Sequence, residues 1–342
     1  MKKRMKKVAT LCLAGVTAMS TVGVTGSAVF AKGDTNYDVE SMDFENVELR
    51  VAFRILTTDL IQTDRLNGIT KLLKSFNKEN EGKIHVTDES ISTESDYEEK
   101  LTTDFASGNV PNAFLQYGGS RTREYVDAGY ILDLTPYFEQ YPEWKEGVQD
   151  FAWETTQFDG IEGTYGIPWS AYQLCLYYNK DYLDQVGVDV PESWDDLVDA
   201  CAKLKDAGIQ PFNYSDKDNY HFEHLMSALA LKAYGTSIAD DLASDKEAYN
   251  GEKMVAIYQK MKDMIDAGYW GDGILSTDFN TERNMFEAGK AAFTVDGTWN
   301  CGNFQNDSDT TLFDAQKIGV TRIPYIDEAN KTERWVAGSD TY

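Results

Sequence analysis

Three short apolar runs decide the fold of the chain, namely VELRVAF (47–53), KIHVT (83–87) and AFLQY (113–117). Each run is rich in β-branched or aromatic residues, which is typical of strands. Between the first two runs, apolar residues recur on one predicted helix face: Leu66, Ile69, Leu72, Leu73 and Phe76. A second helix is expected at 95–107 and ends at Gly108. This order of strands and helices predicts a parallel sheet with right-handed crossovers.

The chain beyond residue 117 continues this alternation. A buried strand is predicted at QLCLYY (173–178), and further strands at AAFTV (291–295), KIGVTRI (317–323) and RWVAG (334–338). Helices are predicted near 220–234 and 247–267. Another helix starts at a Ser193 cap and runs to Ala207, with Gly208 as its stop. The fold class is therefore α/β.

Aromatic, polar and glycine residues follow three of these strands. The stretches are Arg54–Asp59, Tyr117–Arg121 and Asp296–Asn300. Open parallel sheets bind their ligands beyond the carboxyl ends of the strands, so the composition there predicts a polar ligand pocket. No P-loop, GxSxG or GxGxxG motif occurs, and we predict no cofactor.

The composition narrows the ligand class. The 342 residues suffice for roughly two domains, and 57 acidic against 32 basic residues give a net charge of −25. Without the five basic residues of the first seven positions, 27 basic residues face 57 acidic ones, a balance of −30. A chain with this negative charge repels phosphate backbones, which argues against nucleic acid as a partner. Acidity combined with 13% aromatic residues suggests a neutral, polyhydroxylated ligand.

Residues 1–31 are predicted to be a secretory signal peptide. A basic start, MKKRMKK, precedes an apolar run from Val8 to Met19, and Val29 and Ala31 suit cleavage after Ala31. An uncleaved anchor is the alternative. Lipoprotein processing at Cys12 is disfavoured, because Leu11 precedes it where a lipobox has a small residue. No later segment is apolar enough to cross a bilayer, so we expect an exported protein that begins at Lys32. Its first residues, 32–46, are expected to form a linker.

Metal and redox sites are not indicated. His221 and His224 lie three apart on a predicted helix without an HExxH motif, so a solvated or cleft-edge helix face is favoured. Three residues resemble the start of a calcium loop, but a turn with a helix cap is favoured: Asp216, Asp218 and Asn219. The exported part keeps an odd number of cysteines without a CxxC motif: Cys175, Cys201 and Cys301. The first two are expected to be small core residues.

Four segments carry a family resemblance. They are TYGIPWSAYQLCLYYNKDYL (164–183), PESWDDLVDACAKLKDAGIQPF (191–212), LTTDFASGNVPNAFLQYGG with YVDAGYILDLTPYF (101–119 and 125–138), and FEAGKAAFTVDGTW (286–299). Together they resemble the extracellular solute-binding proteins of ABC importers, and more narrowly the sugar-binding group that includes maltodextrin-binding protein. The segments are correctly ordered and spaced from about residue 47 to the end.

The resemblance implies two α/β lobes, each a mainly parallel sheet flanked by helices, joined by strand crossovers. It implies a monomer that is not an enzyme. This monomer captures a mono- or oligosaccharide between its lobes and delivers it to ABC permease subunits. We expect it in the periplasm or at the outer face of the cytoplasmic membrane, retained there without a lipobox.

The resemblance also sets the expected domain boundaries. The N-lobe is expected at 47–168, the C-lobe at 169–334, and a strand that returns to the N-lobe at 335–342. The chain would cross between lobes near Tyr165–Ala171 and back near Trp335–Gly338. Family members continue beyond the return strand with helices that complete both lobes, so the resemblance implies a truncated chain.

The predicted ligand contacts follow from the chemistry of pyranoses. Their apolar faces stack on aromatic rings, and their hydroxyl rims accept and donate paired hydrogen bonds. Trp299 in DGTW matches the stacking tryptophan of the family, and its polar turn after a strand favours a site over the core. The predicted set comprises Trp299, Trp169, Tyr172, Tyr117, Arg121, Arg54, Asp59, Asp296, Asn219 and His221. Three other tryptophans are expected to be structural: Trp144, Trp153 and Trp194.

Two other functions remain open. A binding protein for another solute, such as a peptide or a polyamine, is one alternative, and an acidic cleft would suit polyamines. A secreted glycoside hydrolase is the other, since such enzymes are also acidic and aromatic. It needs two carboxylates beside one bond, and no segment singles out a pair among the 57 acidic residues.

Overall fold

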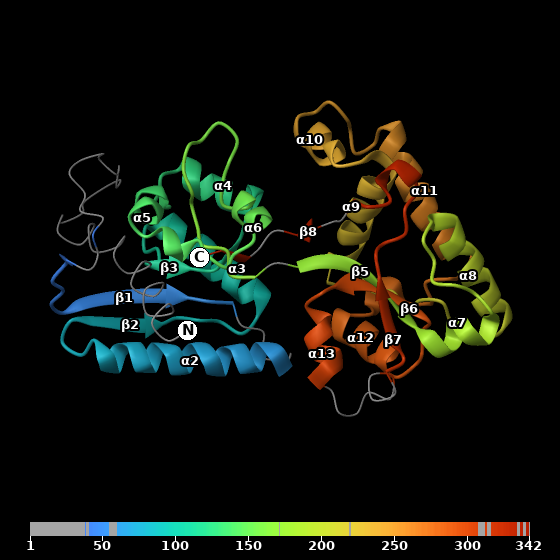
Figure 1. Cartoon of the computed structure of the whole chain (residues 1–342), viewed down its shortest axis with the longest axis horizontal. Helices are drawn as coiled ribbons and strands as arrows, with labels where there is room; N and C mark the ends of the chain where they lie inside the picture. Colours follow the sequence, from blue (N-terminus) through green and yellow to red (C-terminus); the bar gives the residue numbers. More distant parts are fainter. Residues whose placement is uncertain are drawn as a thin grey trace. The chain divides into compact units, whose positions relative to one another are not determined.

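The computed structural model describes residues 38, 41–54, 60–170, 172–218, 220–306, 312, 316–333, 336–337 and 340–341. The predicted signal peptide at 1–31 lies outside the described residues. The chain divides into two compact units (Figure 1). Unit 1 comprises Met1–Ala171 with Gly338–Tyr342, and unit 2 comprises Tyr172–Ala337. The lobe boundaries expected from the sequence stay predictions. Among the described helices, none has both the length and the apolar character needed to cross a bilayer.

Unit 1 is built on a three-stranded parallel sheet in the order β2-β1-β3. Its strands are β1 (Val47–Ala52), β2 (Ile84–Asp88), β3 (Ala113–Phe114), β4 (Gln116–Tyr117) and β9 (Asp340–Thr341). Its helices are α2 (Leu60–Glu79), α3 (Glu94–Ser107), α4 (Ser120–Asp127), α5 (Thr135–Gln140), the 3-10 turn η2 (Pro142–Trp144) and α6 (Asp150–Glu154). The parallel order predicted from residues 47–117 is confirmed. Separately, β4 pairs with β9 in antiparallel fashion.

Two contacts fasten the helices of unit 1 to its sheet. The Tyr97 hydroxyl of α3 is buried and donates to the carbonyl oxygens of Ala52 and Leu115, at 3.0 and 2.6 Å. The Asn77 side chain of α2 both donates to and accepts from the backbone of Val86, at 2.9 and 2.8 Å. Helix α3 ends as predicted at Gly108, whose φ of 72° is a left-handed conformation that glycine adopts easily.

The second half of unit 1 encloses a small aromatic core. Trp144 and Trp153 are both buried there, which confirms them as structural residues. Trp153 meets the ring of Phe138 edge-on at 5.2 Å, and Trp144 stacks on Tyr141 at 4.4 Å.

Unit 2 is organised around the long strand β5 (Tyr172–Asn179). Its other strands are β6 (Phe293–Gly297), β7 (Ile318–Thr321) and β8 (Val336–Ala337). Its helices are α7 (Lys180–Val186), α8 (Trp194–Asp206), α9 (His221–Tyr234), α10 (Ser237–Ala243), α11 (Glu252–Asp266), α12 (Phe279–Glu287) and α13 (Asn300–Asn306), with the 3-10 turns η3 (Ile274–Ser276) and η4 (Glu328–Asn330).

The direction of the unit 2 strands corrects one expectation. Strand β5 runs antiparallel to β6, β7 and β8, so the expected mainly parallel sheet is found in unit 1 and not among these strands. The reason is that a buried apolar run such as QLCLYY is equally suited to parallel and antiparallel neighbours. The parallel inference rested on the strand and helix order of residues 47–117, which does not constrain the later strands.

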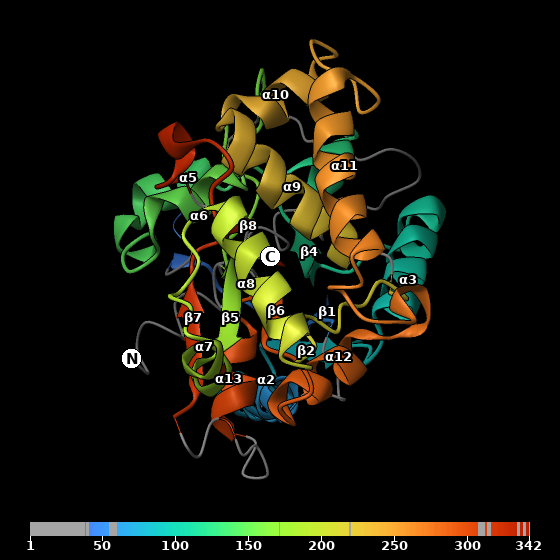
Figure 2. The ribbon, with the colours of Figure 1, turned by 90° about the vertical axis from the view of Figure 1, so that its right-hand side faces the viewer.

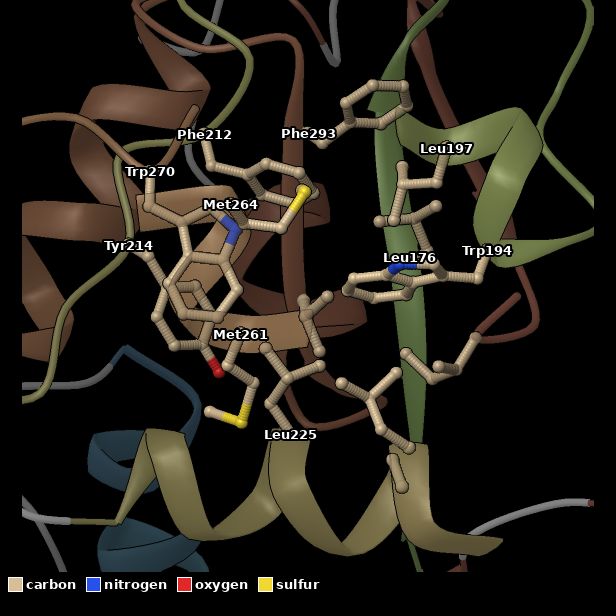
Figure 3. Packing of buried hydrophobic residues seen from close by; sticks show 14 of the residues in the cluster. Leu176, Trp194, Leu197, Phe212, Tyr214, Leu225, Met261, Met264, Trp270 and Phe293 are labelled. Carbon is tan, nitrogen blue, oxygen red and sulfur yellow. The ribbon is translucent and has the colours of Figure 1, made fainter. Parts of the chain in front are cut away.

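The two faces of β5 pack against different helices. Leu174 and Leu176 face a large core with residues of α8, α9 and α11, part of which is shown in Figure 3. Tyr177 points to the other face, against Phe286 of α12 and Phe304 of α13. Figure 2 shows α9 and α11 side by side over this unit. The alternation of side chains along a strand explains both layers.

The predicted cap of α8 is confirmed. The Ser193 hydroxyl accepts from the backbone N–H of Asp196, and the Asp196 carboxylate accepts from the backbone N–H of Ser193 at 2.9 Å. This reciprocal arrangement satisfies two donors at the helix start. Helix α8 buries Trp194 and Cys201, as expected for a structural tryptophan and a small core cysteine. Cys175 is only partly buried.

Lys232 of α9 is a buried lysine whose ammonium group contacts main-chain oxygens. Its Nζ donates to three carbonyls, those of Asn330, Lys331 and Glu333. Its own carbonyl oxygen accepts from the backbone N–H groups of Ile326 and Asp327, at 3.2 and 3.0 Å. These bonds satisfy an ionic group that would otherwise be costly to bury, and they fasten residues 326–333 to α9.

Candidate functional site

Trp299 occupies the turn between β6 and α13, where the sequence predicted a turn after a strand. Its indole is half-buried and lies at the edge of the large core of unit 2. The ring of Tyr172, at the start of β5, meets it edge-on with centroids 4.7 Å apart. The face of the indole is seated on Gly297, because a Cβ there would be 2.1 Å from two ring carbons. Three local contacts therefore fix this ring.

Replacing Gly297 by alanine should disturb this seat. The new methyl group must displace the Trp299 ring, and such overpacking typically costs about 1–3 kcal/mol of stability. Urea unfolding and near-ultraviolet circular dichroism would measure the loss of stability and the moved ring. Gly68→Ala in α2 is the matched control, because a Cβ there meets nothing within 4 Å and alanine favours helices. Equal stability of Gly297→Ala and the wild type would contradict the contact between the Trp299 ring and Gly297.

Asp296 lies directly before this turn and is fully enclosed. Its carboxylate accepts from the backbone N–H of Gly297 at 2.7 Å and from the side-chain amide of Asn300. Burial raises the pKa of Asp296 to about 7. The positive charge of His221 and hydrogen bonds from Gly297 and the Trp299 side chain act in the opposite direction, whereas the Glu282 charge adds to the rise.

The raised pKa of Asp296 has a consequence for stability. Between its ordinary pKa of 3.8 and its folded pKa of about 7, the native protein binds more protons than the unfolded chain. The contribution of Asp296 to the free energy of unfolding therefore falls as pH rises through this window. Asp296→Asn removes the pH-dependent contribution of this carboxyl group. The stability of the variant relative to wild type should therefore increase from pH 4 to pH 7, by at most about 1.4 kcal/mol per pH unit. Urea unfolding at several pH values tests this, and a pH-independent difference would refute it.

His221 is buried beneath this cluster, on the first turn of α9. Its Nδ1 lies 3.1 Å from the Glu282 carboxylate of α12. Burial alone would lower the pKa of His221, but the hydrogen bond to Glu282 and the negative charges of Asp296 and Asp216 raise it. The expectation of a solvated helix face is therefore wrong for His221, because Glu282, 61 positions along the chain, supplies its partner.

Glu282 is the residue that sequence reasoning missed. Besides His221, it accepts from the backbone N–H and hydroxyl of Ser215, at 2.8 and 2.5 Å, and from the Thr294 hydroxyl at 2.8 Å. It sits on a helix among other acidic residues, and no local pattern distinguishes it. Its saturated carboxylate forms the rigid base of the cluster around Trp299.

His224 is half-buried one turn beyond His221. Its ring centroid lies 6.0 Å from Trp299 and 5.2 Å from Tyr220. Burial, together with a smaller contribution from the positive charge of His221, lowers the pKa of His224 to about 4. A neutral imidazole therefore borders the indole at neutral pH.

Unit 1 holds a second group of predicted site residues. Two guanidinium groups lie over the ring of Tyr117, on β4, with Arg54 at 4.3 Å and Arg121 at 4.9 Å from its centroid. Arg121, in the first turn of α4, also forms an ion pair with Glu98 at 3.7 Å. Cations over an aromatic face are attracted by the ring quadrupole, so each arginine is attracted to the Tyr117 ring.

Three predicted residues remain: Trp169, Asp59 and Asn219. Trp169 is 46% exposed in unit 1. Asp59 and Asn219 lie outside the described residues. A cavity of about 240 Å³ in unit 2 is lined by other side chains, among them Gln173, Lys232 and Arg322. Within the described ranges, no three histidine, cysteine or acidic side chains are grouped to hold a metal ion.

The chain has known relatives in sequence and in fold. Residues 62–342 match the family of bacterial extracellular solute-binding proteins. The chain belongs to this family. A binding protein of Brucella abortus is 27% identical over 66% of this solute-binding protein and 52% of the relative. The galactooligosaccharide-binding protein of Bacillus subtilis is 22% identical over 80% of the chain and 61% of the relative. The chain thus spans about half the length of the first of these relatives.

Solved structures confirm the predicted two-lobe α/β fold. A chitin oligosaccharide binding protein superposes with a TM-score of 0.74 at 23% identity, over 85% of this chain and 71% of the other. A structure from work on xylan utilisation by Caldanaerobius polysaccharolyticus gives the same TM-score at 24% identity, over 86% and 72%. At these identities the likeness establishes the fold of this solute-binding protein.

Proposed function

We propose that this solute-binding protein captures a mono- or oligosaccharide outside the cytoplasm and delivers it to the permease of an ABC importer. The observation that carries the proposal is the half-exposed Trp299 indole, held by Tyr172, Gly297 and Asp296 at the end of β6. A fixed aromatic face bordered by polar groups suits the apolar face and hydroxyl rim of a sugar. The relatives named as binding galactooligosaccharides and multiple sugars, and a similar structure in complex with raffinose, support it.

The site residues remain part of this proposal. We assign Trp299 and Tyr172 to the ligand-contacting part in unit 2, with the buried Asp296 as a support of the Trp299 turn, and Tyr117, Arg54 and Arg121 to the part in unit 1. Trp169, Asp59, Asn219 and His221 complete the predicted set. Capture between the two lobes, a monomeric state, export after cleavage at Ala31 and retention without a lipobox stay predictions from the sequence.

Two observations favour a sugar-binding protein over the alternatives. The two arginines over Tyr117 place positive charge in the proposed site, which disfavours a polyamine. The buried carboxylates of Glu282 and Asp296 are enclosed by donors from the protein itself. A glycoside hydrolase needs two carboxylates that reach the substrate, so this pair does not suit hydrolysis.

A ligand screen tests the proposal. Raffinose, xylotriose and chitotriose are compared with spermidine and a tripeptide in thermal unfolding of the full chain. A ligand at 100 times its Kd should stabilise the native state by about 2.7 kcal/mol. We expect at least one sugar to raise the melting temperature and calorimetry to confirm it. A response to spermidine or the tripeptide alone would refute the proposal, as would turnover of a chromogenic glycoside.

A further inference from the structure

Two histidines on the first turns of α9 stand in opposite environments. His221 is buried, and its Nδ1 lies 3.1 Å from the Glu282 carboxylate. His224 lies three positions on, half-buried, with its ring 6.5 Å from that of His221 and 6.0 Å from the Trp299 indole. His221 therefore makes its contact within the protein. His224 borders Trp299, the ring that we propose stacks on the ligand.

We propose that His224 contacts the bound sugar and that the buried pair of His221 and Glu282 tunes it as a partner for hydroxyl groups. The inference rests on the proposed function and adds a contact residue to the site in unit 2. It replaces the predicted role of His221 by its neighbour on the same helix.

The chemistry of imidazole explains why the tuning matters. A neutral imidazole offers one donor and one acceptor, which matches a hydroxyl group that both donates and accepts. A cationic ring would offer donors only. Positive charge on His221 and burial keep the pKa of His224 near 4, so the ring is neutral throughout the physiological range.

The charges around His221 maintain this state. Glu282, Asp296 and Asp216 hold its positive charge, from α12, β6 and the segment before α9. Tyr214 and Tyr220 also face the His221 ring, at centroid distances of 5.5 and 4.6 Å. His221 and Glu282 are each 3% exposed, so their contact is shielded from water.

The test uses the fact that the chain has only three histidines. In the full chain labelled with ¹⁵N-histidine, long-range proton–nitrogen spectra separate cationic from neutral rings. His224→Gln and His85→Gln assign the signals, since His85 is an exposed residue of β2 in unit 1. We expect His221 to be cationic and His224 neutral at pH 7. Glu282→Gln should weaken the charge on His221 and raise the pH at which His224 takes up a proton.

Ligand titrations complete the test, with raffinose, xylotriose and chitotriose as probes. We expect a bound probe to shift the His224 signals and His224→Ala to lose at least tenfold in affinity, while His85→Ala is unchanged. A cationic His224 at pH 7, or affinity of His224→Ala within twofold of wild type, would overturn the inference and leave the proposed function intact. Should His224→Ala fail to fold, an unshifted His224 signal in the probe-bound wild type overturns it. If the wild type binds none of the probes, the proposed function fails and this inference fails with it.

Discussion

Trp299→Ala should weaken sugar binding by about thirtyfold or more. Truncating a buried aromatic anchor commonly costs about 2 kcal/mol, and each 1.4 kcal/mol is tenfold in affinity. In the wild type the indole is already held in place by Tyr172 and Gly297. The variant therefore lacks a pre-positioned aromatic surface for the ligand, and not merely a mobile side chain. Calorimetry with the sugar that raises the melting temperature gives the affinities directly.

The unliganded Trp299→Ala protein should keep most of its melting temperature. Its indole is only partly buried and lies at the edge of the core. Trp299→Phe is the graded control, because it retains an aromatic face and loses the N–H near Asp296. Two results would move Trp299 from the site to the core, namely unchanged affinity of Trp299→Ala or collapse of the unliganded protein.

Trp270→Ala should have the largest effect on stability, about 3–5 kcal/mol. Trp270 is 2% exposed, and its ring lies 5.1 Å from Tyr214 and 5.5 Å from Phe222 (Figure 3 shows Trp270 and Tyr214). Removing it leaves a cavity that rigid neighbours cannot fill. Urea unfolding measures the loss.

Trp169→Ala is the matched control for this experiment. It removes the same side chain from a position that is 46% exposed, where little packing is lost. Its stability should stay within about 0.5 kcal/mol of wild type. Equal losses for Trp169 and Trp270 would contradict the packing described for unit 2.

The elements that the sequence predicted well are those whose signals are local. The end of α3 at Gly108 and the cap of α8 at Ser193 are determined by neighbouring residues, and both predictions are confirmed. The turn that carries Trp299 was predicted for the same reason, since a strand, a glycine and polar residues follow one another. The parallel order of unit 1 follows from alternating strands and helices.

The features that the sequence did not reveal depend on distant partners. The state of His221 is decided by Glu282, and no pattern within α9 indicates that contact. His221 and His224 are three positions apart and so lie on the same side of α9, and no local pattern shows that His221 is buried while His224 is only partly buried. The antiparallel neighbours of β5 come from segments more than 100 positions away, and strand direction leaves no trace in its apolar run.

The buried Lys232 also gives the molecule an internal chemical reporter. An ammonium group that donates to three main-chain carbonyls cannot attack an acylating reagent until residues 326–333 detach from α9. Its rate of acetylation would then follow the local opening of the segment that leads to β8, and exposed lysines would be modified much earlier. Mass spectrometry of timed acetylation could therefore monitor the opening of this segment in the unmodified protein, without any introduced label.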